Sequence, residues 1–283
     1  MATFFNQATL TYNNNVVNSN ITTGEIQEAL TANKTAVLDV YSQGGNVTYV
    51  VNIRNTGTTS RNNLTITDDL GAYIQNGQTR VPLTLVEDSV TLFINGIPQT
   101  SPAVIAGPPL TITGISVPAD GVATIVYIAR INAFAPLGTD DTITNTVTVS
   151  GNGITPITAE ETITAAEEAQ LTITKSLNPT VVTENGQITY TFVIQNTGNT
   201  PIVATDDAII TDAFDPILSN LVVTFNGAVW TAPANYTYNP ATGLFATNPG
   251  QITVPAATYT QDPATGAIII QPGVSVLTVT GTI

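Results

Sequence analysis

Short segments in which hydrophobic and polar residues alternate run along the whole chain, and Gly, Pro or Asn residues separate them. Most segments are rich in Val, Ile and Thr, whose branched side chains suit a pleated sheet. Asn95-Gly96 and Asn226-Gly227 each lie between apolar segments and predict tight hairpins. The nearest candidate for a helix is residues 162–170, where one or two turns would form a linker. The pattern therefore predicts an all-β protein.

The first segment has its own alternating set. These residues occupy every second position and would lie on one face of a strand: Phe4, Asn6, Ala8, Leu10 and Tyr12.

The chain also contains an internal repeat. In both copies a lysine precedes a tyrosine by fifteen residues, Asn-Thr-Gly follows, and an apolar segment then ends in an aspartate. The matching positions are Lys34 and Lys175, Tyr49 and Tyr190, Asn55 and Asn196, and Asp68 and Asp212. We expect two domains of similar fold.

The two copies differ at their ends. The first continues through a strand at residues 143–150 and an extended stretch to about residue 164, whereas the second stops after residues 274–283. The missing strand has a counterpart at residues 6–12, whose pattern matches residues 145–150. The expected order is a donor strand with a connector (1–30), a first β-sandwich (31–164), a linker (165–170) and a second sandwich without its last strand (171–283).

This arrangement predicts assembly. A sandwich that lacks a strand exposes unpaired backbone groups and an apolar groove, and an added strand would fill both. We expect the N-terminal strand to enter the groove beside residues 274–283 of another copy. Because such a contact joins two different surfaces and does not close, identical subunits would form a head-to-tail filament.

The lysines suggest a covalent cross-link. The chain has only two, at matching positions of the repeat, and a lysine in an apolar strand is costly unless it is neutral or paired. A neutral buried lysine is a nucleophile that can attack an asparagine amide and release ammonia, while a buried acid carries the protons. The predicted set within one chain is Lys34, Asn145 and Asp68. The predicted set between subunits is Lys175, Asn6 and Asp212.

Two alternatives remain open at this stage. The lysines could instead form buried salt bridges with the two aspartates, leaving Asn6 and Asn145 as ordinary polar strand positions. Asn55 and Asn196 could also be the acceptors, although Asn-Thr-Gly is typical of a turn after a strand.

The amino-acid composition excludes several classes of partner and of catalytic site. The net charge of −14 disfavours nucleic acid and anionic membranes as partners. The absence of Cys and His from the chain excludes disulfides, thiol nucleophiles, histidine bases and the usual zinc sites. Since no phosphate-binding loop or metal-ligand spacing appears, we expect no enzyme, no cofactor and no metal. The acidic pairs at 68–69, 140–141 and 206–207 are expected to be turn residues, not calcium ligands.

The expected location is extracellular, on a cell or spore surface. The first residues have neither the basic nor the apolar segment of a secretory signal, so release by lysis of a mother cell is one route. No segment approaches the length of a transmembrane helix, and we expect no membrane insertion.

An adhesin or carbohydrate-binding module is the alternative function. If exposed, Trp230, Tyr236 and Tyr238 would form a platform on which a sugar could stack, although a single Trp between apolar residues is more often in a core. A glycan ligand or a surface anchor is left open.

The repeat resembles the conserved-repeat family of prokaryotic surface proteins, domain of unknown function eleven. The resemblance lies in a lysine strand, a turn, a tyrosine strand, Asn-Thr-Gly and Thr-Asp, found at residues 171–175, 190, 196–198 and 211–212, with a weaker first copy. It implies Ig-like sandwiches and a role at the cell surface or outside the cell. Related surface domains contain isopeptide cross-links. Small two-repeat members are similar to subunits of clostridial spore appendages.

Overall fold

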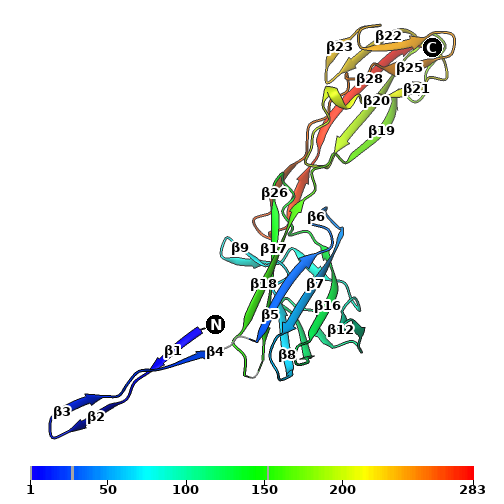
Figure 1. The fold of residues 1–283 in the computed structure, drawn as a ribbon. Helices are drawn as coiled ribbons and strands as arrows, with labels where there is room; N and C mark the ends of the chain where they lie inside the picture. Colours follow the sequence, from blue (N-terminus) through cyan, green and yellow to red (C-terminus); the bar gives the residue numbers. More distant parts are fainter. Residues whose placement is uncertain (1, 27–28, 152) are drawn as a thin grey trace. The chain divides into compact units, whose positions relative to one another are not determined.

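The computed structural model describes residues 2–26, 29–151 and 153–283. This part of the chain consists of β-strands, their connections and one short 3₁₀ helix, η1 (Ala204–Asp206). It contains no helix with the length and apolar character that crossing a bilayer requires. The chain divides into two compact units, residues 1–132 with 143–163, and residues 133–142 with 164–283 (Figure 1). The predicted all-β class is confirmed.

The first unit contains two large sheets. One has the order β13 (Ile97–Pro98), β12 (Thr91–Ile94), β16 (Val122–Ile131), β7 (Asn46–Asn55), β5 (Leu30–Ala36), and β11 (Leu83–Leu85) also pairs with β16. The other has the order β14 (Ala103–Ile105), β15 (Leu110–Val117), β8 (Arg61–Asp68), β17 (Thr142–Ser150), β18 (Ile157–Ala165), β6 (Val40–Tyr41). A separate hairpin joins β9 (Tyr73–Gln75) to β10 (Gln78–Arg80).

The second unit repeats the first of these sheets. Its order is β19 (Leu171–Asn178), β20 (Gln187–Asn196), β28 (Gly273–Thr282), β22 (Ser219–Phe225), β23 (Ala228–Trp230). The facing sheet is smaller, with the order β21 (Thr211–Ala213), β25 (Leu244–Thr247), β24 (Tyr236–Asn239). A further hairpin joins β26 (Thr258–Gln261) to β27 (Ile268–Gln271).

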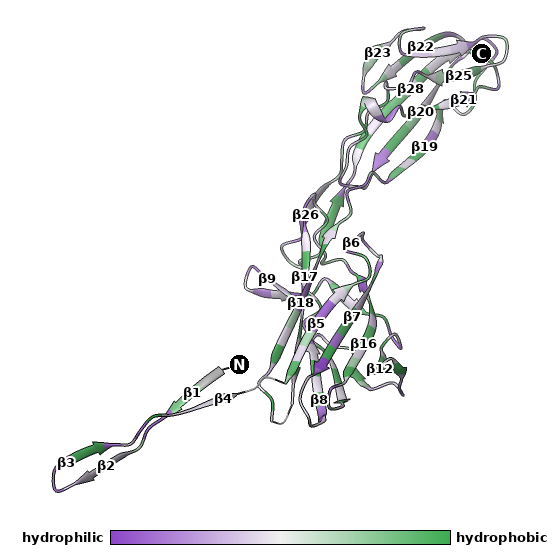
Figure 2. Cartoon of the chain, in the orientation of Figure 1, coloured by the Kyte–Doolittle hydropathy of each residue, from purple (hydrophilic) through white to green (hydrophobic). Residues whose placement is uncertain are grey.

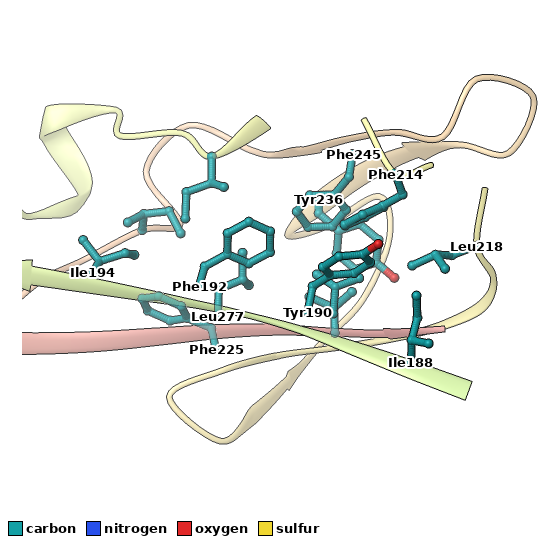
Figure 3. Packing of buried hydrophobic residues seen from close by; sticks show 14 of the residues in the cluster. Ile188, Tyr190, Phe192, Ile194, Phe214, Leu218, Phe225, Tyr236, Phe245 and Leu277 are labelled. Carbon is teal, nitrogen blue, oxygen red and sulfur yellow. The ribbon is translucent and has the colours of Figure 1, made fainter. Parts of the chain in front are cut away.

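Alternation along the central strands builds both cores. Along β7 and β20 every second side chain is buried and the others are at least partly accessible. Hydrophobic and hydrophilic residues both occur along β7 in Figure 2. In the second unit the buried set contains several aromatic residues among aliphatic ones, and Tyr190 of β20 stacks on Phe214 with ring centroids 4.9 Å apart (Figure 3). The ring centroids of Phe214 and Phe245 are 5.8 Å apart. The sequence alternation therefore gives one buried face per strand.

Strand register confirms the internal repeat. Lys34 of β5 pairs with Val51 of β7, and at the matching positions Lys175 of β19 pairs with Phe192 of β20. The predicted Asn-Gly hairpins are also confirmed, since they connect β12 to β13 and β22 to β23. All four turn residues have positive φ, as a type I′ turn requires.

The two units differ beside one strand. In the first unit β8 pairs with β15 on one side and with β17 on the other. Its counterpart β21 pairs with β25 alone among the described residues. The expected groove beside residues 274–283 is therefore wrong, because β28 already has β20 and β22 as partners. The open edge is that of β21, on the opposite sheet.

The N-terminal segment is a two-stranded ribbon and not a single strand with a connector. It contains β1 (Ala2–Asn6), β2 (Thr9–Tyr12), β3 (Asn15–Asn18) and β4 (Thr22–Ile26); β1 pairs with β4, and β2 pairs with β3. The turn residues Asn13 and Asn14 both have positive φ. The sequence missed the return strands because Asn and Ser interrupt their apolar pattern.

The segments between the two units differ from expectation in two ways. Residues 162–170 contain no helical turn, since β18 continues to Ala165 and residues 166–170 have no regular structure. Residues 133–142, which we assigned to the first domain, group with the second unit. Asn199 Nδ2 donates a hydrogen bond to the backbone oxygen of Leu137, at 3.2 Å, and explains part of this grouping.

Candidate functional site

Lys34 is a fully buried lysine in the first unit. Its side chain has no exposed surface, and Nζ donates to Oδ2 of Asp68 at 2.8 Å. Nζ also lies 4.8 Å from the ring centroid of Tyr49. Lys34 lies on the inward face of β5, which also carries the buried Leu30 four residues earlier. Side chains an even number of residues apart share one face of a strand. The site is a charge pair enclosed by aromatic rings.

Asn145, on β17, belongs to the same buried cluster. Its Nδ2 donates to the hydroxyl of Tyr127 at 3.2 Å, and the Tyr127 hydroxyl donates to Oδ2 of Asp68 at 2.5 Å. The backbone N–H of Gly71 donates to Oδ1 of Asn145 at 3.2 Å. The structure thus brings together Lys34, Asp68 and Asn145, the three residues predicted from sequence.

Burial controls the acid–base behaviour of this cluster. It lowers the pKa of Lys34, although the nearby Asp68 carboxylate opposes the shift. Burial raises the pKa of Tyr49 and of Tyr127. A lowered lysine pKa favours the neutral amine, which is the nucleophilic form.

The matching site in the second unit is open. Lys175 forms an ion pair with Asp212, but 41% of its side chain is exposed, against 0% for Lys34. Its Nζ lies 4.5 Å from the ring centroid of Tyr190. No described residue of this chain covers it in the way that β17 covers Lys34. The salt-bridge alternative thus describes the non-covalent contacts of both lysines.

Asn6, the predicted acceptor for Lys175, lies in the N-terminal ribbon and pairs with Thr22. The predicted set joins two copies of the chain, so it stays a prediction.

The rival acceptors are turn residues. Asn55 is buried, and its Nδ2 donates to the backbone oxygens of Thr59 and Pro118, both at 2.9 Å. Asn196 does the same with the backbone oxygens of Thr200 and Pro255, at 2.7 and 3.2 Å. Because their amides hold the turn after the strand, this geometry favours the structural role.

Apolar side chains line the open edge of the second unit. Leu171, Ile173 and Leu177 share the face of β19 that carries Lys175, and they are 45%, 54% and 36% exposed. At the position of Leu171, the first unit has Leu30, which is 5% exposed. The second unit therefore exposes a face that is buried in the first.

The N-terminal ribbon also exposes apolar side chains to solvent. From residue 4 to residue 23 every side chain of the ribbon is exposed, and these include Phe4, Leu10 and Val16. Phe4 covers Gly24 across the ribbon, where an added Cβ would lie 2.3 Å from its ring. The ribbon is ordered by its own pairing but buries almost nothing.

Tyr127 and Gly71 are the members of the buried cluster that sequence reasoning missed. The residue that matches Tyr127 in the second unit is Val279, since they pair with Tyr49 and Tyr190 respectively. Comparison of the repeats therefore could not single out the tyrosine. Its place in the inward alternation of β16 was the available signal.

The acidic pairs hold local turns. Asp69 Oδ1 accepts hydrogen bonds from the N–H groups of Gly71 and Thr146, and Asp141 Oδ2 accepts one from Gly138. Asp206 bonds to the N–H of Val203. Within the described ranges, no three acidic side chains gather in a way that could hold a metal ion.

Trp230, Tyr236 and Tyr238 do not form an exposed platform. Trp230 is partly buried and stacks on Phe225 with ring centroids 4.8 Å apart. Tyr236 is 7% exposed, and the Tyr238 hydroxyl donates to the backbone oxygen of Leu218 at 2.8 Å. These aromatic residues belong to the core and its rim.

Comparison with protein-family models found no match, and comparison with curated proteins found none either. Among solved structures, the pilus backbone RrgB of Streptococcus pneumoniae is 10% identical with a TM-score of 0.35, over 86% of this chain and 55% of its own. BcpA, the major pilin subunit of Bacillus cereus, is 11% identical with a TM-score of 0.35, over 95% and 73%. A collagen-binding domain of a Staphylococcus aureus adhesin is 13% identical with a TM-score of 0.30, over 50% and 99%.

This chain thus spans little more than half of the RrgB structure. Similarity at this level does not establish a shared function.

Proposed function

We propose that this protein is a structural subunit of an extracellular filament. Each subunit inserts its N-terminal ribbon beside β21 of the next subunit, so identical chains join head to tail. The proposal includes a place on a cell or spore surface, and membership of the conserved-repeat surface family that the sequence resembles.

One observation carries this proposal: the chain has both an unpacked ribbon and an unfilled sheet edge. In the first unit, β17 and β18 occupy the position that is open in the second. The ribbon has the same antiparallel form, and Asn6 matches Asn145 in the sequence pattern. Burying one exposed Leu, Ile or Phe completely stabilises by about 1.5–3 kcal/mol, so several such side chains favour docking strongly.

We propose further that Lys–Asn bonds reinforce the assembly. Within the first domain Lys34 would join Asn145, and between subunits Lys175 would join Asn6 after docking. Each bond forms by attack of the neutral lysine Nζ on the amide carbon and releases one ammonia. Asp68 and Asp212 would carry the protons in the two sites. Such bonds constrain the unfolded chain as disulfides do.

The experiment compares the full chain with a variant that lacks residues 2–26. We expect the full chain to form fibres by electron microscopy and ladders that survive boiling on a denaturing gel. The deletion variant is expected to be a soluble monomer by size-exclusion chromatography. Fibres from the deletion variant would overturn donation of the ribbon.

A pair of point variants tests the acceptor. Ile173→Asp places a charge in the open groove, where docking would bury it, and should prevent assembly. Val229→Asp is the matched control, because Val229 is 71% exposed on β23 at the other edge of the same sheet. If both variants assemble equally well, the groove is not the acceptor. If Lys175→Ala fibres dissociate on boiling while wild-type fibres do not, the intersubunit bond is supported.

A further inference from the structure

The buried cluster of the first unit is a continuous hydrogen-bond chain between two nitrogens. It begins at Lys34 Nζ, passes through Oδ2 of Asp68 and the Tyr127 hydroxyl, and ends at Asn145 Nδ2, with distances of 2.8, 2.5 and 3.2 Å. No hydrogen bond joins Asp68 directly to Asn145 in the described part of the cluster, where Tyr127 provides the connection.

We infer that Tyr127 is the proton relay of the Lys34–Asn145 cross-link, and that the N–H of Gly71 binds the amide oxygen as it becomes negative. This inference rests on the proposed intramolecular bond and assigns two groups to it. A phenol can donate and accept a hydrogen bond at once, which a relay requires.

The proton transfers balance. Lys34 first gives one proton to Asp68, which leaves a neutral amine and a neutral acid. The amine attacks the amide carbon of Asn145, and charge develops on Oδ1. Asp68 then passes its proton to Tyr127 as Tyr127 passes its own to Nδ2, and the second Nζ proton returns to Asp68. The C–Nδ2 bond breaks, ammonia leaves, and Asp68 ends protonated.

The oxyanion position depends on a glycine. The Gly71 N–H donates to Oδ1 of Asn145 at 3.2 Å, close to the distance of an oxyanion donor. Gly71 has φ of +73°, and an added Cβ would lie 2.5 Å from Cγ2 of Ile143. This bond also fixes the orientation of the amide, because Oδ1 faces the N–H and Nδ2 faces Tyr127.

Burial suits Tyr127 to this role. The residue is 1% exposed, and burial raises its pKa, so the phenol keeps its proton between transfers. The second unit has Val279 at the matching position. The relay is therefore specific to the first domain, and any bond at Lys175 has to form without it.

The test follows cross-link formation in the full-length chain. Each variant is synthesised in a short pulse, samples are denatured at intervals, and mass spectrometry measures the fraction of the Asn145 peptide joined to the Lys34 peptide. We expect Tyr127→Phe to slow the bond by about 10²-fold or more, the usual effect of a lost acid–base group. Tyr49→Phe is the matched comparison, because its ring stacks on that of Tyr127 at 5.5 Å and its buried hydroxyl lies near Asn145 but makes no hydrogen bond within the described residues.

A second measurement separates proton transfer from packing. Fluorotyrosine at position 127 keeps the ring and the hydroxyl but makes the phenol more acidic. We expect it to restore cross-linking and to shift the pH–rate profile, which a purely structural role would not do. Circular dichroism checks that each variant is folded.

The outcomes are distinct. If the wild-type chain never loses ammonia, both the cross-link and the relay fail. If wild type and Tyr127→Phe react at the same rate, the relay alone is overturned. If Tyr49→Phe is the slow variant, the relay has been assigned to the wrong tyrosine.

Discussion

At the residue scale, the two lysines show how one local sequence pattern acquires two environments. Both pair with an aspartate and face aromatic rings. Only Lys34 is covered by a further strand, and burial lowers its pKa. The difference lies in the neighbouring strand and not in the lysine segment. This difference predicts that the same substitution at the two lysines changes domain stability by different amounts.

Lys34→Met should destabilise the first domain strongly, because it removes the proposed bond to Asn145 and leaves the buried Asp68 without its lysine partner. Removing one partner of a buried pair typically costs about 3–5 kcal/mol. Lys175→Met is the matched control in the unassembled chain, where the pair is partly exposed and should contribute less, closer to the value of about 0–1 kcal/mol for surface pairs. Differential scanning calorimetry measures both. Equal losses would show that burial of Lys34 does not set its contribution.

A pH effect follows from Tyr49. Burial raises its pKa in the folded state, whereas the unfolded chain ionises near its ordinary value of about 10. Above that pH the unfolded state binds fewer protons than the folded state, so stability is full below it and falls as pH rises. Tyr49→Phe removes one such group and should flatten the alkaline fall in the melting temperature of the first domain. Parallel curves for wild type and variant would contradict this.

At the element scale, the ribbon is a β-hairpin whose stability is local. Its type I′ turn at Asn13 and Asn14 and its cross-strand pairs fix the register. A two-stranded hairpin alone is marginally stable in water. Docking into a sheet would supply the missing contacts, and only one face of the ribbon would point inward.

Two adjacent positions test that face. Leu10→Asp should abolish assembly, since Leu10 shares the predicted inward set with Phe4 and Asn6. Thr11→Asp adds the same charge to the opposite face and should leave assembly intact. Light scattering of the purified chains measures assembly. If Thr11→Asp blocks it and Leu10→Asp does not, the inward face has been assigned incorrectly.

At the scale of the whole molecule, the proposed assembly gives each copy one donor and one acceptor. Contacts between unlike surfaces that do not close produce open filaments. In that assembly, a chain without its ribbon would still accept a donor but could not donate. Such a chain should therefore act as a terminator.

Mixing tests this directly. Adding the variant that lacks residues 2–26 to wild-type subunits before assembly should shorten the fibres in proportion to its fraction. Electron microscopy measures the length distribution. The control is the same deletion variant with Ile173→Asp added, which can neither donate a ribbon nor accept one. We expect it to leave fibre length unchanged. If both variants shorten fibres equally, capping is not the cause.

The sequence alone determined the strand content, the repeat and the cluster of Lys34, Asp68 and Asn145. These follow from local alternation, turn residues and matched spacing, which act over a few residues. The repeat also indicated that a strand of the second copy is placed at the start of the chain.

Only the tertiary structure decided which sheet edge of the second unit is open. Strand neighbours are set by long-range pairing, and the sequence does not show that β28 already has two partners while β21 has one among the described residues. Tyr127 joins the cluster for the same reason, because β16 is distant in sequence from Lys34 and Asp68, and Gly71, although close to Asp68 in sequence, meets Asn145 only through the pairing of β8 with β17. Burial, which separates Lys34 from Lys175, is likewise a property of the packed sheets and not of the lysine segments.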